Sequence, residues 1–69
     1  MTEIVFVVEA DPEGGLTARA LGESIFTQAD DMPKLREMVR DAVRCHFPDM
    51  ATRPKVIRIH FVSDEIIAA

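Results

Sequence analysis

The feature that most constrains the fold is a long amphipathic helix predicted within residues 24–47. Its apolar residues recur three and four positions apart, which gathers them into one buried stripe. The stripe consists of Met32, Leu35, Met38, Val39, Ala42, Val43, His46 and Phe47. Asp31 is suited to be the N-cap and Pro33 to lie in the first turn, whereas Pro48 disfavours the α conformation in the residue before it. We therefore predict a helix that begins at Met32, ends before Pro48 and covers a sheet.

The rest of the sequence predicts four strands, because β-branched or alternating runs are separated by turn residues. The predicted strands are residues 3–10, 16–21, 24–29 and 55–63. Gly14 and Gly15 allow the first two strands to form a hairpin, and the helix returns the chain so that the last strand lies parallel to the first. The prediction is an α+β fold, β-β-β-α-β, with a four-stranded mixed sheet of order 3-2-1-4 and one helix on one face.

One face of this predicted sheet has no helix to cover it. Apolar residues on that face and in the tail would be stabilised by association, which small domains often need. We therefore expect a homodimer or higher homo-oligomer that uses this face, the sheet edges or the tail. The expected interface residues are Val5, Val7, Val56, Arg58, His60, Val62, Ile66 and Ile67.

Length and charge limit the classes of function. The 69 residues predict a single domain, residues 1–69, and the net charge of −4 argues against direct nucleic-acid binding, which requires a basic surface. The single cysteine, Cys45, cannot form an internal disulfide, and no apolar run reaches the ~20 residues of a membrane helix. We expect a cytoplasmic protein without a membrane partner.

Several short motifs resemble those of a known family. They are the first strand and turn FVVEADPEGG, the returning strand LTARAL, a third strand that closes on threonine-glutamine, and the Ala29-Asp30-Asp31 entry to the helix. Over about residues 4–47 the chain resembles the HicB-like antitoxin-type domain, in the stand-alone form without a DNA-binding segment. The resemblance implies a shortened ribonuclease H-like sheet with the same element order. It also implies a protein that binds and silences a small basic HicA-type RNA-cleaving toxin.

The acidic residues around the first turn are the main candidate site. We predict that Glu9, Asp11 and Glu13 contact a basic partner through charge complementarity. Together with Asp30 and Asp31 they would suit a divalent metal, if the turn and the helix start were neighbours. Turns and helix caps favour these residue types in any case, so we predict no metal site, no cofactor and no catalytic residue.

Other reactive side chains give no catalytic pair. Cys45 and His46 are neighbours in the predicted helix and point about 100° apart, so we expect a structural cysteine. His60 is expected at the surface or in an interface.

The expected function is a non-enzymatic HicB-like interaction module, the antitoxin that occludes a HicA-type toxin. The alternative is a stand-alone oligomer that binds a ligand or regulates an enzyme. A metal-dependent nuclease is the least favoured class.

Overall fold

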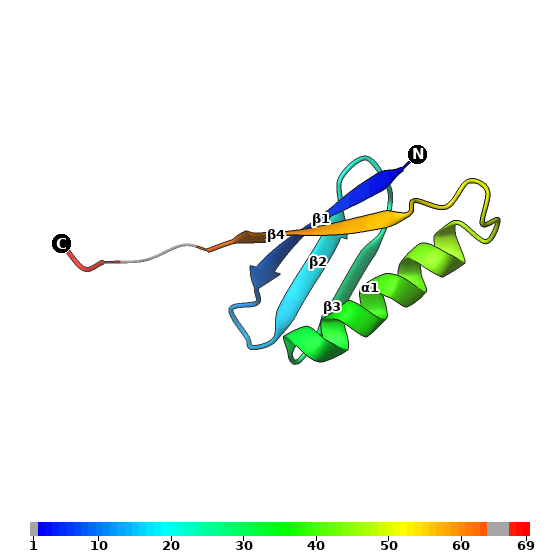
Figure 1. Cartoon of the computed structure of the whole chain (residues 1–69). Coiled ribbons are helices and arrows are strands. Elements are labelled where there is room, and N and C mark those ends of the chain that lie inside the picture. Colours follow the sequence, from blue (N-terminus) through cyan, green and yellow to red (C-terminus); the bar gives the residue numbers. More distant parts are fainter. Residues whose placement is uncertain (1, 64–66) are drawn as a thin grey trace.

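The computed structural model describes residues 2–63 and 67–69. Along the chain its elements are β1 (Glu3–Ala10), β2 (Leu16–Ala20), β3 (Phe26–Ala29), α1 (Met32–His46) and β4 (Val56–Val62). The strands form one four-stranded sheet in the order β3-β2-β1-β4 (Figure 1). β1 is antiparallel to β2 and parallel to β4, and β2 is antiparallel to β3. The predicted element order, strand order and mixed sheet are confirmed.

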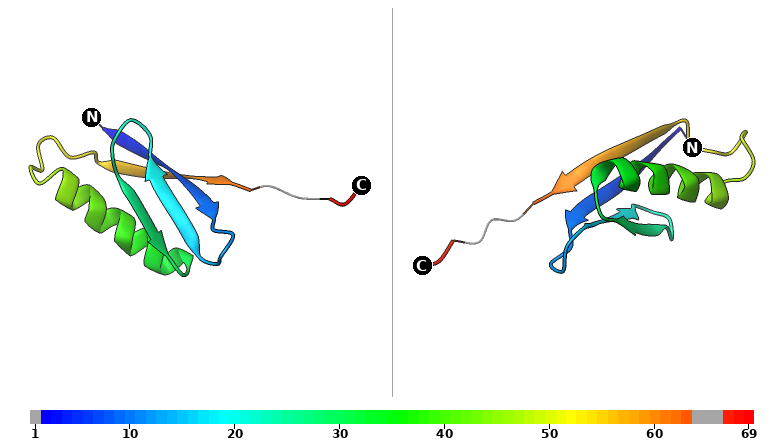
Figure 2. Two further views of the ribbon diagram at one scale, coloured as in Figure 1. Left: turned by 180° about the vertical axis from the view of Figure 1, so that it is seen from behind. Right: turned by 90° about the horizontal axis from the view of Figure 1, so that it is seen from below.

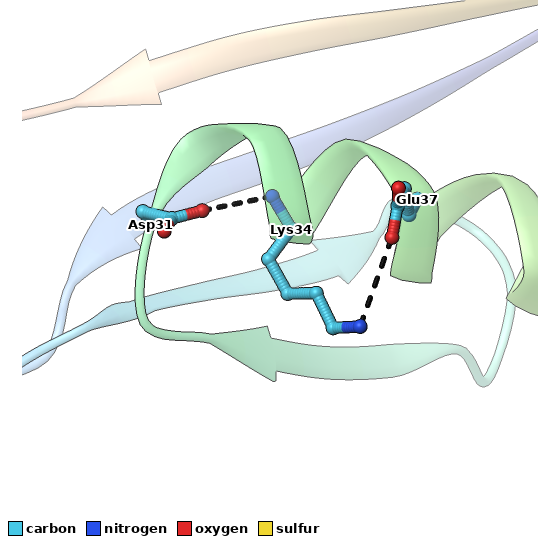
Figure 3. Close-up of polar contacts among 3 residues, drawn as sticks. All are labelled: Asp31, Lys34 and Glu37. Carbon is cyan, nitrogen blue, oxygen red and sulfur yellow. Dashed lines mark hydrogen bonds and ion pairs between the residues drawn. The ribbon is translucent and has the colours of Figure 1, made fainter.

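The predicted helix start is confirmed in detail. Asp31 is the N-cap, and its Oδ1 accepts a hydrogen bond from the Lys34 backbone N–H at 2.9 Å (Figure 3). The Lys34 Nζ then lies 3.7 Å from Glu37 Oε2, one turn further along. At the other end, the Phe47 N–H donates to the Val43 carbonyl at 2.9 Å before Pro48 stops the helix.

The hydrophobic core lies between α1 and the face of the sheet that it covers, which we call the inner face (Figure 2). Strands β1 and β2 and the residue before β3 supply the sheet side with Ile4, Phe6, Val8, Ala18, Ala20 and Ile25. The helix contributes Leu35, Val39 and Val43, none more than 2% exposed. α1 packs over β2 and β3. The inner face of β4 is less covered, so Ile57 and Ile59 are half-buried and Phe61 is 56% exposed.

The register separates the two sheet faces as predicted. Ile57, Ile59 and Phe61 pair with Ile4, Phe6 and Val8 of β1, which places all six on the inner face. On the opposite side, the outer face, Arg58 pairs with Val5 and His60 with Val7.

The strand ends differ slightly from the prediction. β3 begins at Phe26, two residues later than expected, because the Ala20 N–H donates to the Ile25 carbonyl at 3.0 Å and closes the turn there. β4 covers Val56–Val62, so one residue at each end of the predicted strand lies outside it.

Candidate functional site

A hollow of about 500 Å³ lies where the β1–β2 turn meets the beginning of α1. Its charged lining residues are Asp11, Glu13, Asp30 and Lys34, and we call it the acidic hollow. Its apolar lining comes from residues such as Leu16, Ala29 and Met38. Three acidic residues and one lysine line the hollow, and the ammonium group of Lys34 lies 3.7 Å from Glu37 Oε2. The hollow therefore carries net negative charge.

The turn on one side of the hollow is fixed by its own hydrogen bonds. The Asp11 N–H donates to the Gly15 carbonyl and the Gly14 N–H donates to the Asp11 carbonyl, both at 3.0 Å. The Asp11 Oδ1 accepts from the Glu13 N–H at 2.9 Å. This side chain holds the turn together in the manner typical of aspartate, while Glu13 is exposed and free to meet a partner.

Gly15 brings the turn against the end of β3. Its φ is +83°, and a Cβ built on it would lie 2.8 Å from the Ala29 carbonyl oxygen. Because real side chains do not approach backbone oxygen so closely, only glycine fits this contact. The contact joins residues that are far apart in the sequence and places Glu13 and Asp30 around one hollow.

The structure brings together part of the predicted partner-binding set. Asp11 and Glu13 line the acidic hollow, and Asp30 joins them from the helix start. Glu9 does not line it, because Glu9 is exposed beside Thr17 and Val62 on the outer face. Lys34 was not predicted, although its position in the first helical turn after Asp31 could have indicated it.

The carboxylates do not form a metal centre. Within residues 2–63 and 67–69 no group of three or more His, Cys, Asp or Glu side chains is arranged to hold a metal ion. Asp31 is occupied as the helix cap and Asp11 as the turn acceptor. The hollow is better suited to a cationic side chain than to a divalent ion, since a guanidinium or ammonium group needs only one or two carboxylate oxygens.

The outer face combines apolar and basic side chains, and two of its apolar residues differ in exposure from the prediction. One row across the four strands consists of Phe26, Arg19, Val7 and His60. Val7 was expected to be exposed, but Arg19 and His60 flank it and leave it 8% exposed. Phe26, 63% exposed, was missed because the neighbouring residues of its strand are polar.

The remaining predicted interface residues lie mostly on β4. Val56 and Val62 are 52% and 38% exposed on the outer face. Arg58, between them, forms an ion pair with Glu3. Ile67 is 79% exposed, whereas Ile66 lies outside the described residues.

Two side chains at the C-terminus of α1 are more exposed than the sequence predicted. Cys45 is exposed and so does not belong to the core. His46 is also exposed, and its Nε2 lies 3.1 Å from Glu23 Oε2 instead of joining the buried stripe. Because the imidazole of His46 is engaged with a carboxylate and packs edge-on against Phe47, it gives no base for the cysteine.

Comparison with known proteins gives two clear relatives. Over 53 residues the chain is 55% identical to a UPF0150 protein of Archaeoglobus fulgidus, a match that covers 77% of each chain. Over 66 residues it is 44% identical to a UPF0150 protein of Thermotoga maritima, which covers 96% of this chain and 91% of the relative. The chain belongs to the UPF0150 family.

No family model matches this UPF0150 sequence, and no solved structure matches it. The match to the T. maritima UPF0150 protein includes both the acidic hollow and β4, because it spans 96% of the chain. The names of the two UPF0150 relatives state no activity, ligand or partner. In the described part of this UPF0150 chain, no helix is long and apolar enough to cross a membrane.

Proposed function

We propose that this UPF0150 chain is a non-enzymatic interaction module of the HicB type, which binds a small basic HicA-type RNA-cleaving toxin in the cytoplasm. The observation that carries the proposal is the acidic hollow. Glu13 and Asp30 are exposed on its two sides, and the turn hydrogen bonds hold Asp11 between the strands. An arginine or lysine of the partner would enter the hollow and pair with these carboxylates.

The mechanism is occlusion. A toxin that cleaves RNA needs a basic surface to hold the phosphate backbone. The module, with a net charge of −4, would cover that surface and exclude RNA. Complementary charge also accelerates the encounter of the two proteins, most strongly at low salt. The short motifs shared with HicB-like domains support this proposal independently of charge.

The proposal is tested by the rate of association with a small basic HicA-type protein, measured by stopped-flow fluorescence at several salt concentrations. We expect the double variant Glu13→Lys with Asp30→Lys to associate roughly tenfold more slowly at low salt, and the slope against salt to become flatter. Asp11 is left unchanged because its side chain holds the turn.

The matched control places the same change of charge elsewhere on the molecule. We therefore compare single variants, Glu13→Lys at the hollow against Asp41→Lys on α1.

Asp41 suits this control because it is exposed on α1 and does not line the hollow, and because its ion pair with Arg44, at 3.6 Å, is exposed and contributes little to stability. We expect Asp41→Lys to associate at close to the wild-type rate. Equal slowing by Asp41→Lys and Glu13→Lys would mean that net charge alone matters and that the hollow is not the binding site. An unchanged rate for Glu13→Lys at low salt would remove the electrostatic basis of the proposal.

A second candidate function, a stand-alone oligomer with a ligand-binding or regulatory role, is favoured by a different observation. β4 pairs only with β1 and leaves its other edge without a strand in the described part of the chain. A reading frame for a small basic protein beside the gene favours the antitoxin. Its absence favours the regulatory oligomer.

A further inference from the structure

The free edge of β4 is the least protected part of the sheet. β4 is seven residues long, whereas β3 at the opposite edge has four. Short strands, charged residues and proline normally prevent unwanted pairing at an edge. β4 has none of these devices except Arg58, and Val56 and Phe61 are 52% and 56% exposed. A long apolar edge of this kind is a template for another strand.

The hydrogen bonding of β4 determines which of its residues can pair outward. The Val56 N–H donates to the Thr2 carbonyl at 3.0 Å, toward the β1 side. Successive residues of a strand direct their backbone groups to opposite edges. Arg58 and His60 therefore bond toward β1 like Val56, and the intervening residues turn their N–H and C=O groups to the free edge. These outward residues are Ile57, Ile59 and Phe61.

The sequence of β4 is symmetric in residue type about its centre. The strand reads VIRIHFV, so around Ile59 the residue pairs are Arg58 with His60, Ile57 with Phe61, and Val56 with Val62. We propose that two copies of this chain pair antiparallel through β4, with a two-fold axis between their Ile59 residues. The two sheets then form one continuous sheet, and no edge of β4 is left unpaired.

This register matches apolar with apolar on the inner face, while the outer face pairs Val56 with Val62 and Arg58 with His60. On the inner face Ile59 stands opposite its counterpart, and Ile57 stands opposite Phe61 of the other copy. The backbone N–H and C=O groups of these residues point to the free edge, so each such pair also exchanges backbone hydrogen bonds. A two-fold axis at Arg58 would instead set two guanidinium groups opposite each other, which is unfavourable.

A groove beside β4 gives the side chains of the second copy a place to pack. It has a volume of about 160 Å³, lies between α1 and β4, and is lined by Arg36, Val39, Arg40, Ile57 and Ile59. The two-fold axis is perpendicular to the sheet, so both helices lie on the same side. Phe61 of each copy then lies next to the groove of the other, where its exposed ring is removed from water.

The pairing is tested first by sedimentation velocity of the full chain at tens of micromolar. We expect a dimer, and we expect Phe61→Ser to raise its dissociation constant at least about tenfold, since burying a phenylalanine is worth more than one factor of ten. The matched control is Met50→Ser, because Met50 is 78% exposed in the loop before β4. A monomeric wild type would overturn the proposal.

The register is tested by disulfide formation in a Cys45→Ser background, which removes the exposed native thiol. Arg58→Cys and His60→Cys are prepared separately and mixed. Residues 58 and 60 of the two copies form a pair without backbone hydrogen bonds, with Cα atoms about 4.5 Å apart, which is within disulfide range. We expect a covalent dimer from the mixture and little from either variant alone, where the thiols lie too far apart.

A mixture that does not cross-link, or single variants that cross-link as well as the mixture, would show a different interface and overturn the proposal. The dimer requires no basic partner. It is therefore tested independently of the acidic hollow.

Discussion

Among single residues, Gly15 allows the β1–β2 turn to approach the end of β3 beside the acidic hollow. Its φ is +83°, and an added Cβ would meet the Ala29 carbonyl oxygen at 2.8 Å. We expect Gly15→Ala to lower the free energy of unfolding by about 1–3 kcal/mol, measured by urea titration. Gly14→Ala is the control, because Gly14 also has a positive φ but nothing within 4 Å of the added Cβ. Equal losses for the two variants would mean that the contact with β3 contributes nothing.

Val7 gives a second prediction at this scale. It is 8% exposed between Arg19 and His60, whereas Val56 on the same face is 52% exposed. An aspartate at position 7 would lose the buried apolar contacts of valine and would be largely desolvated, and Arg19 beside it would offset only part of that cost, so Val7→Asp should destabilise the fold itself by about 2–3 kcal/mol. Val56→Asp should cost much less in the same urea titration. Similar losses would show that the outer face does not protect Val7.

At the scale of elements, the start of α1 depends on Asp31. The Asp31 Oδ1 accepts the Lys34 N–H at 2.9 Å, so Asp31→Ala should cost about 1 kcal/mol of stability in urea unfolding. The control is Asp30→Ala, because Asp30 is exposed and does not cap the helix. An equal loss at both positions would assign the effect to the helix dipole instead of the cap.

The same element shows why local features could be predicted from the sequence. The limits of α1 depend on Asp31, Pro33 and Pro48, all of which act on adjacent residues. The strand order also follows from local turns and one helical crossover. In contrast, the start of β3 depends on a hydrogen bond between Ala20 and Ile25, which periodicity does not reveal.

The acidic hollow could be predicted only in part for a related reason. Asp11 and Glu13 were recognised as a turn cluster, but their proximity to Asp30 depends on how closely Gly15 approaches Ala29. Burial of Val7 depends on its neighbours across the sheet, which become known only with the register. Contacts between distant segments therefore account for most of what the sequence did not reveal.

At the scale of the whole molecule, the arrangement of carboxylates leads to a prediction about catalysis. Two of the acids near the turn and the helix start already act as structural acceptors, Asp11 in the turn and Asp31 at the cap. We expect the purified protein to cleave no RNA in the presence of Mg²⁺ or Mn²⁺, assayed by gel electrophoresis of labelled RNA. Cleavage that disappears in an Asp11→Asn variant would contradict the proposed non-enzymatic function.

The parallel pairing of β1 with β4 also affects how the chain folds. Of the four strands in the sheet, β1 is synthesised first and its partner β4 last. The hairpin of β1 and β2 can form early, but one edge of β1 stays open until β4 arrives. Closing so long a loop is entropically costly and slows folding. Substitutions in the hairpin should therefore change mainly the folding rate, and those in β4 mainly the unfolding rate.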